Sequence, residues 1–380
     1  MAPRGRGGPF LPGSKRRATW GSVAVDKSVM SVHQPGFAVG DEFLGRLATA
    51  PPRRLASKGT ADIGGRMRVA SILREHGLSG AGSPVRIAGS SNEVWAAGPL
   101  IVRVSFDRSS VRLRREAMLH AMLSKEAMHP KVYAAGSATF GEYIVVARCP
   151  GATLSELWAE LKVAERRNLI HELAVAARQV HETSLTPQQR KQLWGSGEPK
   201  ALLSIDEMIE MTEMLEGTPH VDRGLMKAAR GQVSALAGAF DPGEQMGLVH
   251  GDLHLENVLA QPEGLTALID FEWAHPGFAE QDVDTIARFC VQPELHTMGS
   301  YKLERADFLD VLRWFAEAYP ELFESPRFRR RLDWCAFSYE LPALLKFPPT
   351  DSARSLPTWH PMNRLAELVN FGPAAAVLGW

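Results

Sequence analysis

The sequence predicts an α+β protein in which a small β-sheet carrying one helix precedes a mainly helical part. Strand-like runs rich in β-branched residues gather between residues 85 and 147, where turn signals separate them. Beyond residue 151 the apolar residues recur with helical spacing. A Cys-Pro-Gly break at residues 149–151 separates the two patterns. We therefore expect three segments, residues 1–60, 61–148 and 149–380.

Residues 1–60 differ in composition from the rest of the chain. They contain ten basic and three acidic residues, and fifteen are Gly or Pro. Glycine raises the entropic cost of ordering, and proline removes backbone donors. We expect a disordered basic extension here. A dispensable extension, or a start at Met30 or Met67, is favoured over an arm that binds nucleic acid or a partner.

Composition gives little indication of an unusual partner or compartment. The 380 residues include 43 basic and 43 acidic side chains, so the balance favours neither nucleic acid nor an acidic membrane as the main partner. Three cysteines lie far apart, which indicates neither a disulfide framework nor a zinc site. No apolar run reaches the roughly 18 residues of a membrane span. We expect a cytoplasmic protein without a membrane segment.

The first ordered part begins near residue 61 with a helix that ends at Gly77. Its expected apolar face is Met67, Val69, Ala70, Ile72 and Leu73. Strands are expected at residues 85–96, bent at 89–92, and at 100–106. A helix follows over residues 111–123, and two short strands at 131–134 and 142–147. The expected buried residues of that helix are Leu113, Ala117, Leu119 and Leu123.

The second part reads as a series of helices. They are expected at residues 154–161, 164–181, 203–216, 221–240, 282–291, 305–319, 327–344 and 362–371. The helix over 164–181 places five apolar residues on one face: Leu169, Ile170, Leu173, Ala177 and Val180. Only the stretch 248–273 interrupts, with loops and short strands.

That stretch carries the chemistry. Asp252 and Asn257 lie in a polar loop, and Asp270 ends a short apolar run. Phosphoryl transfer needs a metal ion on the phosphates and a carboxylate near the attacking hydroxyl. Mg²⁺ prefers oxygen ligands and keeps several waters. Asn257 and Asp270 suit the metal, which leaves Asp252 to orient the hydroxyl and accept its proton.

The segments HGDLHLENVL and IDFEWAHPG resemble the aminoglycoside phosphotransferase family, which groups with choline-type kinases. His250-Gly251-Asp252 stands where protein kinases have His-Arg-Asp, and Glu272 replaces the Gly of Asp-Phe-Gly. The resemblance covers about residues 61–375. It implies a two-lobed protein-kinase-like fold, with an antiparallel sheet in the first lobe. It also implies Mg²⁺, ATP or GTP as co-substrate, and a small hydroxylated acceptor.

The resemblance also implies a nucleotide site in the first lobe. Arg103 is the candidate for the cation on the phosphates, with Glu116 as its anchor; the alternative for Arg103 is an exposed strand residue. The small residues Ser90, Ser91 and Asn92 would form a phosphate-binding turn, although a plain hairpin is the alternative. The backbone at Ala147 and Cys149 would meet the adenine edge.

Supporting roles are implied for three further residues. His250 would brace the loop, and Asp282 would do so from the following helix, with Asp284 as the competing candidate. Glu272 would face either a cationic substrate or solvent.

Three other functions were weighed. A zinc protease is disfavoured, because Gly251 stands where a helical His-Glu-x-x-His motif needs Glu. A protein kinase is disfavoured, because about a dozen residues between Asp270 and the next helix leave no room for an activation segment. An inactive kinase-like binding module stays open.

The acceptor also stays open among aminoglycosides, macrolides, peptide antibiotics, choline and homoserine-like metabolites. A cationic acceptor would need acidic residues, of which the candidates are Glu207, Glu210, Glu213, Glu216 and Glu340. An apolar pocket would instead use Met208, Met211 and Met214, although acidic and Met residues at helical spacing are more often a solvated face and a core. A role in antibiotic resistance or in metabolism, the choice of ATP or GTP, and the oligomeric state are all left open.

Overall fold

A computed structural model describes residues 61–372, apart from residues 88, 90–91, 108–109, 196, 198–201, 242, 298–302 and 351–355. The expected basic extension, residues 1–60, lies outside the described residues. The described residues belong to one compact unit. No helix among them is long and apolar enough to cross a membrane.

The first part of the chain forms a five-stranded antiparallel sheet with the strand order β1-β2-β3-β5-β4. Its strands are β1 Val85–Ile87, β2 Asn92–Ala97, β3 Leu100–Ser105, β4 Val132–Ala138 and β5 Gly141–Ala147. All five lie in runs where strands were expected, with β1 and β2 as the two halves of the bent run 85–96. Short connections join β1 to β2, β2 to β3 and β4 to β5, which favours antiparallel pairing of these strands.

Two helices accompany this sheet, and both had been expected, although only the second had been placed on the sheet. They are α2 Ala61–Glu75 and α3 Arg112–His120. Helix α2 packs Val69, Ile72 and Leu73 into the core around Trp95. Met67 is 68% exposed, so its place on the predicted face was wrong. Because each residue turns an α-helix by about 100°, Met67 lies on the side opposite that face. Gly65 lies on the buried face instead, directly against the Trp95 ring.

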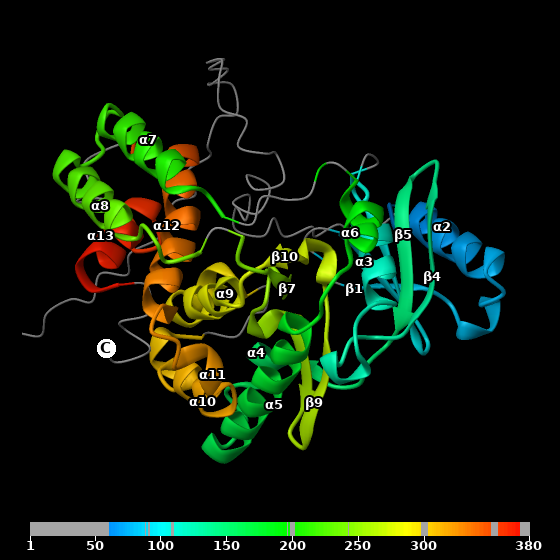
Figure 1. Cartoon of the computed structure of the whole chain (residues 1–380). Coiled ribbons are helices and arrows are strands. Elements are labelled where there is room, and N and C mark those ends of the chain that lie inside the picture. The colour runs from blue at the N-terminus through cyan, green and yellow to red at the C-terminus, as the bar shows by residue number, and fades with distance from the viewer. Residues whose placement is uncertain are drawn as a thin grey trace, which may run out of the picture. The chain divides into compact units, whose positions relative to one another are not determined.

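The second part is mainly helical, as expected. Its longer helices are α5 Val163–His181, α6 Pro187–Trp194, α7 Ile205–Glu216, α8 Arg223–Ala235, α9 Glu280–Val291, α10 Val311–Ala318, α12 Phe328–Lys346 and α13 Pro361–Phe371. The single turns α4 Leu154–Leu157 and α11 Pro320–Phe323 complete the set. Helices α7, α8, α12 and α13 pack together (Figure 1). The fold is the predicted α+β arrangement.

Several helix limits differ from the prediction. Helix α8 stops at Ala235, and the chain then turns at Gly238, whose φ is +77°. The helix expected over 305–319 is split into a 3-10 turn, Arg305–Phe308, and α10. Helix α6 was missed. Its signal was Thr186, whose side chain and that of Gln189 cap each other's backbone N–H groups.

Two small sheets frame the polar stretch. One joins β6 Ala152–Thr153, β8 Val258–Gln261 and β9 Gly264–Leu268, and the other joins β7 Gly247–Val249 to β10 His275–Gly277. Between β7 and β8 runs a loop of residues 250–257, which ends in a 3-10 turn, Leu255–Asn257. We call it loop 250–257.

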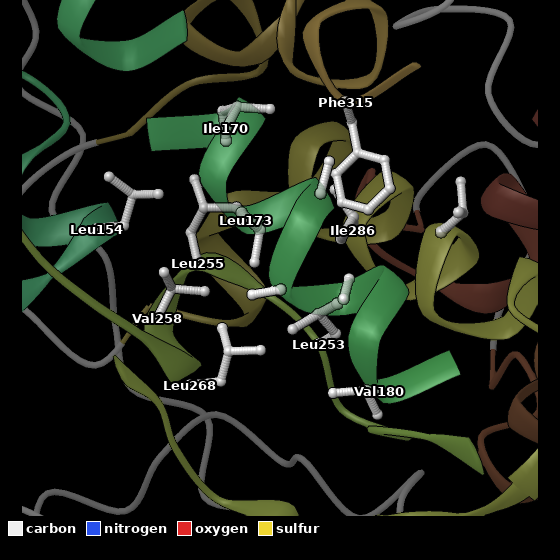
Figure 2. Close-up of a cluster of buried hydrophobic side chains, with 14 of the residues drawn as sticks. Leu154, Ile170, Leu173, Val180, Leu253, Leu255, Val258, Leu268, Ile286 and Phe315 are labelled. Carbon is white, nitrogen blue, oxygen red and sulfur yellow. The ribbon is translucent and has the colours of Figure 1, made fainter. Parts of the chain in front are cut away.

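Loop 250–257 is fixed to the core by its own apolar residues. Leu253 and Leu255 are buried and lie among the inward side chains of α5, including Ile170 and Leu173 (Figure 2). Burial of each leucine contributes about 1.5–3 kcal/mol. These two side chains alternate with Asp252 and His254 along the loop. The alternation therefore turns the polar residues away from the core, toward the site.

Candidate active site

Loop 250–257 begins with a backbone turn that only glycine fits. The φ of Gly251 is +78°, a region that L-residues rarely adopt. A Cβ atom at this position would lie 2.4 Å from the carbonyl oxygen of Trp273. The absence of a side chain thus lets the loop pass close to the segment that follows Asp270.

A single buried carboxylate accepts two backbone hydrogen bonds from this turn. Asp282, in the first turn of α9, accepts the N–H of His250 at 2.8 Å and the N–H of Gly251 at 2.9 Å. The Nε2 atom of His181 lies 3.0 Å from Oδ2 of Asp282. Burial alone would raise the pKa of Asp282, but the hydrogen bond and charge of His181 outweigh it and lower the pKa. Asp284 instead pairs with Arg288 at 2.9 Å.

His250 links the loop to the end of β9. Its Nε2 lies 3.0 Å from the carbonyl oxygen of Ile269, and its Nδ1 lies 3.4 Å from the N–H of Asp252. Burial lowers the pKa of His250. A neutral ring that donates from Nε2 and accepts at Nδ1 satisfies both contacts. Both nitrogens thus face backbone groups, which argues against a zinc ligand.

Asp252 and Asn257 meet across the loop. The Nδ2 of Asn257 donates to the carbonyl oxygen of Asp252 at 2.9 Å and to its Oδ2 at 3.2 Å. The Asn257 side chain therefore keeps its Oδ1 for another partner. The Asp252 side chain is 38% exposed, so a second molecule can reach it. Burial would raise the pKa of Asp252, but the neighbouring imidazole of His254 lowers it below its usual range.

The second aspartate lies beside Asn257. The carbonyl oxygen of Asn257 accepts the N–H of Ile269 at 3.0 Å, which places the start of the Asp270 turn next to loop 250–257. Asp270 has a φ of +70°, an uncommon left-handed conformation for a residue other than glycine. Such strain is found at functional sites. Asp252, Asn257 and Asp270, which are separated along the chain, therefore lie in one polar region.

Arg103 forms ion pairs with three carboxylates that come from two parts of the chain. One nitrogen, Nη1, lies 2.7 and 2.8 Å from the two oxygens of Glu116 on α3. The other, Nη2, contacts Asp270 and lies 3.5 Å from Oε2 of Glu272. Burial raises the pKa of Glu116 and of Asp270, although Arg103 opposes it. Arg103 is buried, so the alternative of an exposed strand residue was wrong.

Glu272 also lies inside this cluster. It is 2% exposed, so the alternative that it faces solvent was wrong. Its Oε2 accepts from Nδ2 of Asn92 at 2.9 Å, which places the start of β2 against the Asp270 segment. Ser90 and Ser91 lie outside the described residues. Burial raises the pKa of Glu272, and the charge of Asp270 adds to this.

Helix α3 contacts the Asp270 segment through two arginines that were not predicted from the sequence. Arg115 donates to the carbonyl oxygen of Glu272 at 3.3 Å. The guanidinium of Arg112 lies 4.3 Å from the centre of the Trp273 ring, a cation–π contact. The signal was the run RLRRE, whose first and fourth residues share one helix face with Glu116.

The segment at the end of β5 is partly engaged within the sheet. Ala147 donates its N–H to Lys131 at 2.8 Å, and Arg148 donates its N–H to Pro99 at 2.8 Å. A contact between Ala147 and a base would therefore use the Ala147 carbonyl oxygen or side chain. Cys149 is half-buried.

The acidic residues that were candidates for binding a cationic acceptor lie in different surroundings. Glu210 and Glu213 are exposed, Glu207 caps α7 at Ser204, and Glu216 pairs with Arg230. Glu340 is buried and pairs with Arg364. The Met208 and Met211 side chains lie in the core, and Met214 is half-buried. Most of the α7 set thus behaves as an ordinary amphipathic helix.

Comparison with known proteins adds the family. Residues 84–300 match the phosphotransferase enzyme family. This span includes the sheet, loop 250–257 and Asp270, and it is more than half of the chain. The chain belongs to the phosphotransferase enzyme family. It matches no curated protein by sequence.

Solved structures support the fold of this family member. A GDP complex of aminoglycoside 2'-phosphotransferase-IIIa aligns with a TM-score of 0.54 at 14% identity, over 81% of this chain and 98% of that one. A thermostable mutant of aminoglycoside phosphotransferase APH(4)-Ia, in a ternary complex with ADP and hygromycin B, aligns at 0.51 and 18% identity, over 79% and 96%.

A choline/ethanolamine kinase family protein from Mesorhizobium loti aligns with a TM-score of 0.51 at 16% identity, over 84% of this chain and 100% of that one. The expected kinase-like two-lobed fold is confirmed. The phosphotransferase is of the kinase type.

Proposed function

We propose that this phosphotransferase moves the γ-phosphate of ATP or GTP to a hydroxyl group of a small molecule. Two groups of contacts carry the proposal: Asn257 with Asp252, and Arg103 with Glu116 and Asp270. The backbone hydrogen bond from Ile269 to Asn257 joins the two groups. An inactive binding module is less favoured, because all five side chains are present in these groups. We also propose residues 61–148 as the nucleotide-binding lobe and 149–380 as the catalytic lobe.

The donor set fits a divalent metal. Asn257 turns its amide nitrogen to Asp252 and keeps Oδ1, and the Asp270 carboxylate is 25% exposed. Two oxygen donors from the protein suit Mg²⁺, which keeps waters and phosphate oxygens as its other ligands. When bound, Mg²⁺ would neutralise charge on the phosphates. We propose Asn257 and Asp270 as the residues that hold it.

Other side chains of the site would position the acceptor hydroxyl and bind the nucleotide. Asp252, exposed beside the metal pair, would orient the acceptor hydroxyl and take its proton. Arg103 would turn Nη2 to the non-transferred phosphates, while Glu116 holds Nη1 and fixes the direction of the guanidinium. Asn92, with the turn before it, and the backbone near Ala147 and Cys149 would hold the nucleotide.

The acceptor is proposed to be small. Helix α9 begins at Glu280, so residues 271–279 alone separate it from Asp270, and a peptide-binding activation segment has no room. An aminoglycoside-type antibiotic is our first candidate, since related structures are named as aminoglycoside phosphotransferases and one holds hygromycin B. A choline- or homoserine-type metabolite is the alternative, favoured by the choline/ethanolamine kinase likeness. We propose action in the cytoplasm.

The test is a transfer assay with purified protein, Mg²⁺ and γ-labelled ATP or GTP, against aminoglycosides, macrolides, choline and homoserine. Asp252→Ala should abolish transfer and leave nucleotide binding intact. Asp310→Ala, the same change at an exposed aspartate just before α10, is the matched control and should keep full activity. Undiminished turnover by Asp252→Ala would rule out the assigned role of this carboxylate.

A further inference from the structure

We propose that His254 is a positioning residue, which holds the carboxylate of Asp252 in the orientation that receives the acceptor hydroxyl. The inference rests on the proposed phosphotransfer and adds a residue to its site. His254 lies in loop 250–257, two residues after Asp252, and its side chain is 11% exposed. In the sequence, His250 and His254 have the four-residue spacing of the zinc-protease motif that Gly251 disfavours.

The first observation is a contact to one carboxylate oxygen. Nε2 of His254 lies 3.5 Å from Oδ1 of Asp252. The other oxygen, Oδ2, receives Nδ2 of Asn257 at 3.2 Å. Each oxygen of the carboxylate therefore has one of these two side chains beside it. Contacts of this length at catalytic groups commonly tighten when substrate binds.

The second observation decides which nitrogen carries the hydrogen. Nδ1 of His254 is buried and has no hydrogen-bond partner among the described residues. A buried N–H without a partner costs about 1–3 kcal/mol, so a proton on Nδ1 is disfavoured. The ring hydrogen then sits on Nε2, where it faces Oδ1 of Asp252 as a donor.

The third observation is the support of the ring. The His254 imidazole lies nearly parallel to the Phe289 ring, with an angle of 12° and 5.9 Å between centres. Phe289 lies on α9, seven residues after Asp282. Seven residues are two helical turns, so both side chains leave the same face of α9. One helix thus supports loop 250–257 twice, through Asp282 at its start and through Phe289 behind His254.

A purely packing role for His254 makes a different prediction from a positioning role. Phenylalanine keeps the ring stack but has no donor. Glutamine loses the ring but can bring an amide N–H to the place of Nε2. The donor and the stack can therefore be separated with two variants of the full chain, His254→Phe and His254→Gln.

The first experiment measures release of phosphate from ATP and from GTP with Mg²⁺, using water as the acceptor. We expect His254→Phe to lower kcat at least tenfold with the KM for nucleotide within twofold, and His254→Gln to recover most of kcat. The control is His296→Phe, which alters the other imidazole beside the His254 ring and should keep wild-type kcat. Wild-type kcat in His254→Phe, or equal losses in both His254 variants, would overturn the proposal.

The second experiment does not depend on turnover. Imidazole ¹⁵N NMR at pH 8.5 should show His254 with its proton on Nε2, and Asp252→Ala should change that signature. His254→Gln assigns the signal by its loss. A His254 signal that is indifferent to Asp252→Ala overturns the proposal, even in a protein that transfers no phosphate. An enzyme without turnover but with the coupled signal would instead count against the proposed function alone.

Discussion

Replacing Asp282 by Asn tests how far loop 250–257 depends on one buried carboxylate. The two oxygens of Asp282 accept the N–H groups of His250 and Gly251 and face Nε2 of His181. Asn offers one carbonyl oxygen, so its amide group must face one of these donors. A lost hydrogen bond to a charged group costs about 1.5–3 kcal/mol, and the unpaired donor adds about 1–3 kcal/mol. We expect the free energy of unfolding to fall by about 2.5–6 kcal/mol.

The pH dependence of this loss follows from the lowered pKa of Asp282. A carboxyl group whose pKa is lower in the folded chain stabilises the fold above its unfolded pKa, and this stabilisation is lost as pH falls through the folded value. The difference between wild type and Asp282→Asn should therefore be largest near neutral pH. It should shrink below the unfolded value of about pH 4.

The matched control is Asp284→Asn, the same change two residues along α9. Asp284 is also buried but pairs with Arg288, so its loss destabilises the fold without touching loop 250–257. Urea unfolding from pH 3 to 8 gives the stability of each variant, and phosphate release below its melting range gives kcat. We expect both variants to be destabilised and only Asp282→Asn to lose kcat, by tenfold or more. Equal kcat in the two variants would refute the role given to Asp282.

Three further predictions concern other parts of the chain. Gly251→Ala should cost about 2 kcal/mol or more of unfolding free energy in urea, because the new Cβ meets Trp273 at a strained φ; wild-type stability would contradict this. Arg103→Lys should raise the nucleotide KM about tenfold, because an ammonium group cannot replace the planar guanidinium that Glu116 orients. An unchanged KM in titrations with ATP and GTP would contradict this. Burial raises the pKa of Asp333 to about 6, so its ionisation costs stability as pH rises through 6. Asp333→Asn should therefore stabilise the fold by about 1–3 kcal/mol at pH 7.5 and by nothing at pH 3.5, which paired urea titrations measure.

Local patterns were enough to propose the chemistry of the site. The spacing of Asp252, Asn257 and Asp270, with a glycine before the first, depends on short-range geometry that a loop and the next strand impose directly. The pair Arg103 and Glu116 could be proposed for a similar reason, since a strand and the helix after it are neighbours along the chain. The strands and most helices followed from apolar spacing.

Other features could not be read from the sequence, because they depend on which face of an element meets which neighbour. Asp282 and Asp284 stand two residues apart on one helix, so they point about 200° apart, and only the packing of α9 selects the residue under loop 250–257. Glu272 was undecided for the same reason, until Asn92 and Arg103 were found against it. His254 gained a role only once Phe289 lay behind its ring.

The sequence by itself determined the reaction class, because phosphoryl transfer needs a few oxygen-bearing residues at fixed short separations, and those separations survive in the chain. The tertiary structure decided how these residues are held. Long-range contacts, such as Asp282 to Gly251 and Arg103 to Asp270, join elements far apart along the chain. Which neighbours these elements meet depends on how buried residues such as Leu253 and Leu255 pack against other elements, and the local sequence does not specify those neighbours.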